Sequence, residues 1–158
     1  MELNDHHTAM RHALQEAIDA AARDEVPIGA VLVDTRTGEI LAKNGNRTRE
    51  LADPTAHAEI LVIREECAKR KVQRLDHCRL YVTLEPCPQC AAAISFARIE
   101  TVVFGADDPK SGGVVSGPQL YTHPQLHHKP EVISGILAQD CGKILSDFFA
   151  KKRHDKAR

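Results

Sequence analysis

The chain has 158 residues, of which 42% are hydrophobic and 27% charged, and its formal net charge is −1. This balance is typical of a single globular domain and argues against a protein that coats nucleic acid by charge alone. No apolar run is long enough to cross a bilayer, and the first residues (1–7) are polar, so we expect no signal peptide and a cytoplasmic location.

The first half of the chain predicts a helix, two strands and a second helix, because apolar residues recur first at helical spacing and then in a β-branched run. Their ranges are 6–22, 28–33, 39–42 and about 54–69. The turn 34–38 joins the two strands into a hairpin. Asp53 as N-cap and Pro54 at the first helical position predict the start of the second helix.

The second half continues the alternation of strands and helices. The predicted elements cover 79–84 (strand), 86–98 (helix), 101–104 (strand), 131–133 (short strand) and 137–148 (helix). The loop 106–130 holds four of the eight prolines, and loops of this length are usually functional. The alternation predicts an α/β fold: a three-layer α/β/α sandwich around a mixed sheet of about five strands. We expect one domain over 1–158, with a basic tail from about residue 151.

Two cysteines separated by two residues mark the start of the third predicted helix, in the segment PCPQC (86–90). Cys87 and Cys90 lie on nearly the same face of that helix, and the free N–H groups at its start favour thiolates. Two thiolates do not complete a zinc site, but His57, near the start of the second helix, can supply a third ligand. Three protein ligands leave one position for water, as in catalytic zinc sites. Alone, the cysteine pair would also fit a thioredoxin-type redox motif.

Glu59 follows His57 by two residues, so the two side chains cannot share an orientation and Glu59 is poorly placed as a ligand. We expect it to face a metal-bound water and to carry protons between that water and a substrate. A lone HxE motif usually means a surface histidine. Here HAE and PCxxC both open predicted helices, and together they are the signature of zinc-dependent nucleobase deaminases.

Beyond these motifs, the sequence resembles the bacterial tRNA-specific adenosine deaminases of the cytidine deaminase-like superfamily, from about residue 9 to 153. The segments that carry the resemblance are EVPIGAVLV (25–33), GNR (45–47), DPTAHAEI (53–60), LYVTLEPC (80–87), VVFGADDPKSG (102–112) and SDFFAKKR (146–153). HAE and PCxxC mark the superfamily, and the outer segments narrow the similarity to the tRNA enzymes.

The resemblance implies hydrolytic deamination of the wobble adenosine in a tRNA anticodon stem-loop to inosine, by a homodimer with one Zn²⁺ per chain. It implies a metal site of His57, Cys87 and Cys90, with Glu59 as the catalytic proton shuttle. It further implies substrate-binding roles for Asn46, Ala58, Pro86 and His123. RNA contacts are implied for Lys110, Lys151, Lys152 and Arg153.

Other hypotheses share parts of this pattern. A free nucleobase or nucleoside deaminase acting on guanine or cytosine would have the same zinc site. A non-catalytic zinc-bound interaction subunit would be expected to lack the shuttle carboxylate, whereas Glu59 is present. A redox protein would have a metal-free, reversibly oxidised cysteine pair. Pro88 and Gln89 stand between the cysteines where the family has Thr or Val followed by Met. This departure concerns the choice of substrate rather than the binding of the metal.

Overall fold

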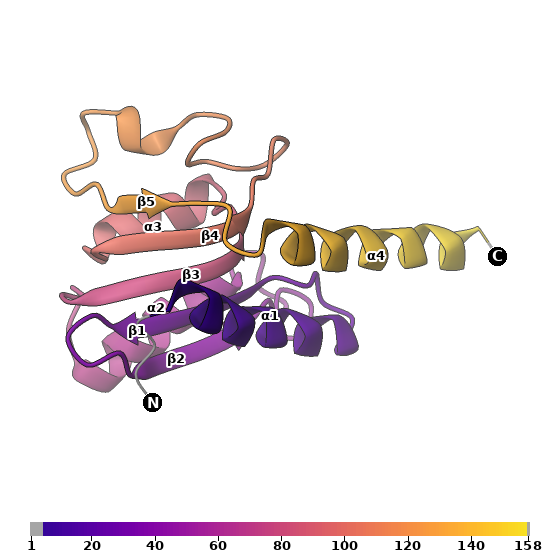
Figure 1. Cartoon of the computed structure of the whole chain (residues 1–158), viewed down its shortest axis with the longest axis horizontal. Coiled ribbons are helices and arrows are strands. Elements are labelled where there is room, and N and C mark those ends of the chain that lie inside the picture. The colour runs from indigo at the N-terminus through magenta and orange to yellow at the C-terminus, as the bar shows by residue number, and fades with distance from the viewer. Residues whose placement is uncertain (1–4, 158) are drawn as a thin grey trace.

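A computed structural model describes residues 5–157. Residues 1–4 of the polar N-terminal segment and residue 158 of the basic tail lie outside this range. The elements follow in the order α1 (His6–Ala22), β1 (Gly29–Asp34), β2 (Ile40–Gly45), α2 (Ala58–Arg70), β3 (Cys78–Leu84), α3 (Pro88–Phe96), β4 (Thr101–Ala106), a 3-10 helix (Leu120–Thr122), β5 (Glu131–Ile133) and α4 (Ala138–Lys156) (Figure 1).

The strands form one mixed sheet in the order β2-β1-β3-β4-β5. β1 pairs antiparallel with both β2 and β3, whereas β3, β4 and β5 are parallel to one another. The α3 segment makes the crossover between the parallel strands β3 and β4, as such a connection requires. The predicted hairpin and the mixed five-stranded sheet are confirmed.

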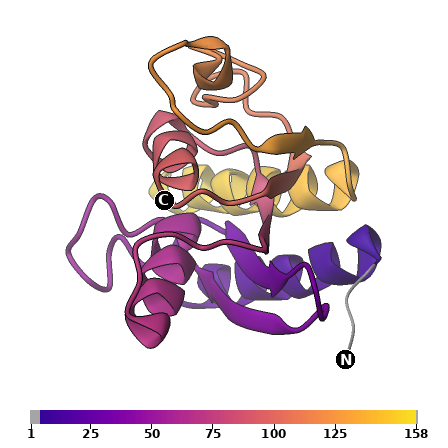
Figure 2. The same cartoon turned by 90° about the vertical axis from the view of Figure 1, so that its left-hand side faces the viewer.

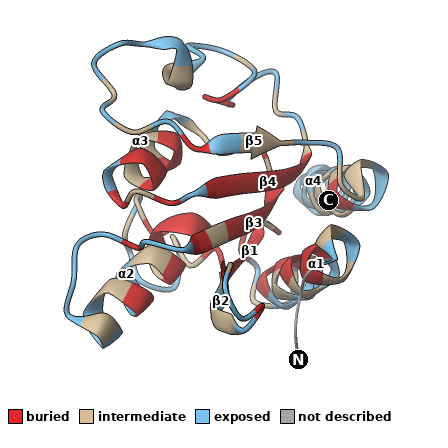
Figure 3. Ribbon diagram, turned by 60° about the vertical axis from the view of Figure 1, so that its left-hand side comes forward, coloured by how far each residue is buried: buried red, intermediate tan, exposed pale blue. Residues whose placement is uncertain are grey.

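Helices cover both faces of the sheet, which confirms the three-layer sandwich (Figures 2 and 3). Successive strand residues point to opposite faces. Val31, Val33 and Tyr81 pack with residues of α1 and α4, and their neighbours Leu32 and Leu80 pack with residues of α2 and α3. Burial on both faces explains why β1 is a continuous apolar run rather than an alternating one.

The second helix begins at Ala58, so the predicted start at Pro54 is wrong. Asp53 opens a turn instead: its carboxylate accepts hydrogen bonds from the backbone N–H of Thr55 (2.9 Å) and from the Thr55 hydroxyl (2.7 Å). The backbone N–H of Ala56 then bonds the Asp53 carbonyl at 3.1 Å. The signal read as a helix start closes a local turn, and this leaves His57 as the N-cap residue of α2.

Two further features position the site. The second hairpin strand runs to Gly45, three residues beyond the prediction, and ends beside Asn46. α4 runs beside α1 and projects beyond the ends of the strands (Figure 1). None of the helices within residues 5–157 combines the length and the hydropathy that a membrane span needs.

Candidate metal centre and substrate cavity

The N-termini of α2 and α3 meet beside the carboxyl end of β3. His57 is the N-cap residue of α2 and Cys87 is the N-cap residue of α3, and neither side chain caps its own helix. Both side chains are therefore free to bind something else. The positive ends of two helix dipoles converge on this point, which favours anionic ligands such as thiolates.

The three predicted ligand residues come together. Nδ1 of His57 lies 3.5 Å from Sγ of Cys87 and 3.5 Å from Sγ of Cys90, and the three ligand atoms lie within 4.8 Å of one another. A tetrahedral zinc ion, with bonds of about 2.3 Å to sulfur and about 2.0–2.1 Å to nitrogen, holds its nitrogen and sulfur ligands about 3.5 Å apart. The geometry of this donor set fits zinc.

The protonation of the cysteine pair is set by its contacts. The hydrogen bond from the Cys90 thiol lowers the pKa of Cys87 to about 4, with a further contribution from His57. The same hydrogen bond, together with burial, raises the pKa of Cys90. The hydrogen bond with Cys87 raises the pKa of His57, although burial opposes this. The low pKa of Cys87 favours its thiolate form, and a divalent cation would displace the remaining protons of the three ligands.

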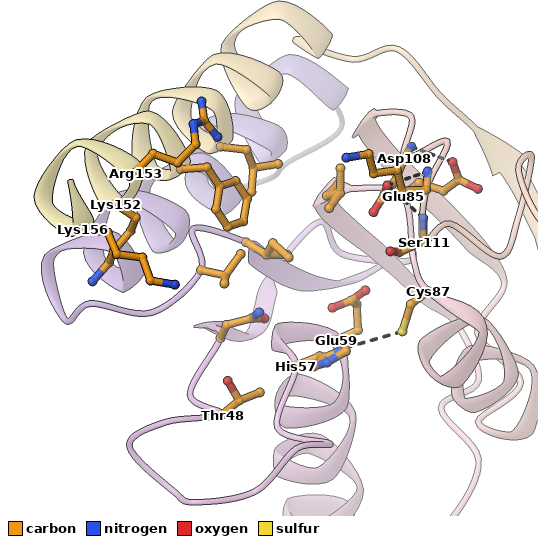
Figure 4. A pocket seen from close by; sticks show the side chains of 17 residues that line it. Thr48, His57, Glu59, Glu85, Cys87, Asp108, Ser111, Lys152, Arg153 and Lys156 are labelled. Atoms are coloured by element: carbon orange, nitrogen blue, oxygen red, sulfur yellow. Dashed lines mark hydrogen bonds between the residues drawn. The ribbon is translucent and has the colours of Figure 1, made fainter.

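Glu59 lies in the first turn of α2, and its side chain points between His57 and Cys87 into a cavity (Figure 4). Only 3% of the residue is exposed, and one of its carboxylate oxygens is buried without a hydrogen-bond partner among the described residues. Burial raises the pKa of Glu59 to about 7. A carboxyl group that titrates near neutral pH can both accept and donate a proton, which is what general acid–base catalysis requires.

The cavity has a volume of about 820 Å³, within the range of about 300–1,000 Å³ that is usual for small-molecule sites. Four segments wall it around the metal centre: the segment between α1 and β1, the loop after β2, the loop after β4, and α4 (Figure 4). The apolar side chains that α4 contributes to the cavity wall are Leu145 and Phe149. Cations gather at its walls, and these are Lys110, Lys152, Arg153 and Lys156.

Asn46 lines the cavity and also fixes the start of α2. Its Oδ1 accepts the backbone N–H of Ala58 at 2.8 Å. Because a backbone N–H only donates, this bond settles which end of the amide is oxygen. The Asn46 NH₂ group is then left to donate to a ligand, so the cavity presents a donor to any acceptor on a bound ligand.

The other predicted substrate-binding residues lie in different settings. Ala58 is buried, and Pro86 is buried with its carbonyl accepting the N–H of Gly113 at 2.8 Å. His123 is exposed, bonds the Pro118 carbonyl through Nε2 at 2.9 Å, and is absent from the cavity lining.

The predicted RNA contacts also divide. Lys110, Lys152 and Arg153 line the cavity, and Lys152 forms an ion pair with Asp24 as well. Lys151 lies instead in the groove between α1 and α4.

Sequence reasoning gave no role to Glu85, although its position directly before Pro86 and Cys87 placed it at the site. It is 2% exposed and lines the cavity. Burial alone would raise the pKa of Glu85, but hydrogen bonds from the loop after β4 outweigh this and lower it. Phe149 was also missed, because the helical spacing pointed to Phe148, which lies in the groove toward α1.

Comparison with known proteins gives concordant matches. The sequence model of the MafB19-like deaminase family matches residues 4–153. A tRNA-specific adenosine deaminase of Agrobacterium fabrum is 55% identical over 146 residues, covering 92% of this chain and 95% of the relative.

Two solved structures are informative. One comes from a study of A-to-I editing by tRNA:A34 deaminases at the wobble position; it is 54% identical, with a TM-score of 0.85, and covers 87% of this chain and 99% of that chain. Guanine deaminase from Nitrosomonas europaea has a TM-score of 0.78 at 21% identity, over 95% of this chain and 87% of its own, which speaks to the fold alone.

Proposed function

Because the chain belongs to the MafB19-like deaminase family and groups with the tRNA-specific adenosine deaminases, we propose that it converts the wobble adenosine of a tRNA to inosine by hydrolysis. The observation that carries this proposal is the meeting of His57, Cys87 and Cys90 beside a cavity that is walled by cations and lined by Glu59, one of whose carboxylate oxygens has no hydrogen-bond partner among the described residues. Since tRNA is its substrate, we place the enzyme in the cytoplasm.

One zinc ion per chain, held by His57, Cys87 and Cys90, is part of the proposal. Support comes from the two nitrogen–sulfur distances of 3.5 Å and from the low pKa of Cys87. When bound, zinc would lower the pKa of water from about 15.7 to about 7 and so supply a nucleophile at neutral pH.

Glu59 moves the protons. It accepts one from the attacking water and delivers it to N1 of adenine while the water oxygen adds to C6. It then takes the remaining proton from the new hydroxyl group on C6 and passes it to the exocyclic amine. The C6–N bond breaks as the C6 carbonyl forms, so that water is consumed, ammonia leaves and inosine is formed. Its pKa of about 7 suits both directions of transfer.

The cavity walls bind the substrate in this proposal. An adenosine extruded from the anticodon loop enters the cavity, where the Asn46 NH₂ group donates to an acceptor on the base. Ala58 and Pro86 support this pocket through their backbone. Lys110, Lys152 and Arg153 face the flanking phosphates. We propose His123 and Lys151 as contacts with RNA outside the cavity, and a homodimer as the working assembly.

Incubation of the enzyme with a tRNA anticodon stem-loop bearing a wobble adenosine, and separately with guanine and cytosine, tests the proposal. We expect inosine at the wobble position of the RNA. A stem-loop that carries adenosine only at another loop position is the matched control and should stay unmodified. Ammonia from a free base without inosine in the RNA would favour the free-base deaminase hypothesis instead.

A further inference from the structure

Two buried carboxylates stand behind the two loops that wall the cavity. Glu25 is 1% exposed and lies behind the loop after β2, and Glu85 is 2% exposed and lies behind the loop after β4. In Figure 4 the two loops, marked by Thr48 and by Asp108, lie on different sides of His57 and Glu59. The proposed chemistry uses neither carboxylate.

Glu85 gathers the donors of the loop after β4. Its Oε1 accepts the backbone N–H of Asp108 (2.9 Å) and the hydroxyl of Ser116 (2.9 Å). Its Oε2 accepts the backbone N–H groups of Val114 (3.0 Å), Val115 (3.0 Å) and Ser116 (2.9 Å). Both oxygens accept only, so a carboxylate fits this place and a carboxamide does not. Bonds to a charged acceptor are stronger than neutral ones.

Packing shows that the loop after β4 is built closely around this carboxylate. A Cβ atom at Gly112 would overlap the carboxyl group of Glu85, and a Cβ atom at Gly113 would lie 2.8 Å from the backbone nitrogen of Pro88. Asp108 and Lys110, which line the cavity, belong to the same loop. The position of these side chains therefore depends on Glu85.

Glu25 holds the opposite loop in the same manner. Its Oε2 accepts the backbone N–H of Glu50 at 2.8 Å, and its Oε1 accepts that of Arg49 at 3.1 Å and the hydroxyl of Thr48 at 3.5 Å. Thr48 and the neighbouring Asn46 line the cavity. Glu25 lies in the turn between α1 and β1, so it ties this wall to the sheet.

We propose that Glu25 and Glu85 are positioning residues for substrate binding, each holding one wall of the cavity at the spacing that an extruded nucleoside requires. This inference rests on the proposed function, because it concerns binding of the same RNA. Since neither residue takes part in proton transfer, their loss acts mainly on KM, through the walls, rather than on kcat.

The holoenzyme variants Glu25→Gln and Glu85→Gln test this in a crossed design. Hydrogen exchange should quicken at the amides of residues 49–50 in the first variant only, and at those of residues 108 and 114–116 in the second only. KM for the anticodon stem-loop should rise about tenfold or more in each, the loss expected when a hydrogen bond to a charged acceptor is removed, with a much smaller change in kcat.

Glu66→Gln is the matched control, since Glu66 is a buried carboxylate on α2 that pairs with Arg70 (2.6 Å) and does not line the cavity. It should lower the melting temperature and leave KM unchanged. Should Glu85→Gln fail to fold, Ser116→Ala removes a single bond to Glu85 and should raise KM by a smaller factor.

Two results would overturn the inference: an unchanged KM despite faster exchange in the variant's own loop, or a rise in KM matched by Glu66→Gln. Failure of the proposed function would look different, because the parent enzyme itself would then form no inosine.

Discussion

Glu59 is the residue on which the proposed chemistry depends most directly. It is a buried carboxylate near the three ligand atoms, and one of its oxygens has no hydrogen-bond partner within residues 5–157. Replacement by glutamine keeps its shape and removes its capacity to carry a proton. We expect Glu59→Gln to retain one zinc per chain and to lose inosine formation by a factor of about 10²–10⁴ or more, as for other general acid–base groups. Metal content and single-turnover assays on the same preparation measure both. Parent-like turnover would remove Glu59 from the mechanism.

The buried Glu59 also predicts how the stability of the zinc-stripped protein depends on pH. Its folded pKa of about 7 lies above the unfolded value of 4.5, so the folded state binds more protons between these two pH values. The stabilising contribution of the protonated group is complete below about pH 4.5 and is lost as the pH rises through 7. This contribution to the free energy of unfolding is about 3 kcal/mol.

Denaturant unfolding of the zinc-stripped parent and of zinc-stripped Glu59→Gln at pH 5 and at pH 8 measures this effect. The parent should lose stability relative to the variant on going to pH 8. A constant difference between the two proteins would show that the pKa of Glu59 is not raised.

At the scale of elements, α1 packs against β1 through a glycine. A Cβ atom at Gly29 would lie 2.6 Å from the backbone nitrogen of Ala17, and would also overlap the carbonyl oxygen of Ala13. Because both neighbours are helix backbone, neither can move aside without shifting α1. We expect Gly29→Ala to cost about 3 kcal/mol or more in the free energy of unfolding.

Gly142, inside α4, is the matched control. A Cβ atom there would meet nothing closer than Ala106 at 4.0 Å, so Gly142→Ala should stabilise the protein by about 0.5–1 kcal/mol through the helix propensity of alanine. Urea denaturation of the two variants checks the pair. Equal effects of the same sign would contradict this packing.

The sequence predicted the elements well where one signal dominated. The β-branched run of β1 and the helical spacing of α1 and α4 predicted these elements correctly. The apolar residues that form each pattern are the ones that pack in the core. The start of α2 could not be placed, because Asp53 and Pro54 serve a turn as well as a helix start. Whether the Asp53 side chain caps a helix or closes a turn depends on the residues that follow it. Here it bonds Thr55 and closes a turn, and the helix begins only after His57, which is its N-cap residue.

The candidate site divides in the same way. His57, Glu59, Cys87 and Cys90 could be predicted because ligand chemistry restricts residue type and spacing. The role of Glu85 could not, because its hydrogen-bond donors lie 23–31 residues away along the chain and carry no side-chain signature. A backbone amide looks the same in every residue, so only the folded loop shows which carboxylate it reaches.

At the scale of the whole molecule, a chain of net charge −1 must gather its cations locally to bind RNA. The cavity gathers four, three of which, Lys152, Arg153 and Lys156, stand on the exposed end of α4. We expect Arg153→Ala to weaken binding of the anticodon stem-loop and to reduce the slope of log K against log salt by about 1, the loss of one phosphate contact.

Lys143→Ala removes the same charge from α4 but at a site that pairs with Asp147 and does not line the cavity. Its slope should match that of the parent. Fluorescence anisotropy across a salt titration measures both variants, and identical slopes for Arg153→Ala and the parent would exclude Arg153 as a phosphate contact.

X-ray absorption at the zinc edge of the reconstituted enzyme tests the central claim most directly. The account predicts one zinc per chain, with two sulfurs at about 2.3 Å, one imidazole nitrogen at about 2.0–2.1 Å and one further light atom from solvent. Four protein ligands would contradict the account, because no position for water would then remain beside Glu59. A shell without two sulfurs would also contradict it, because the ion would then be held elsewhere.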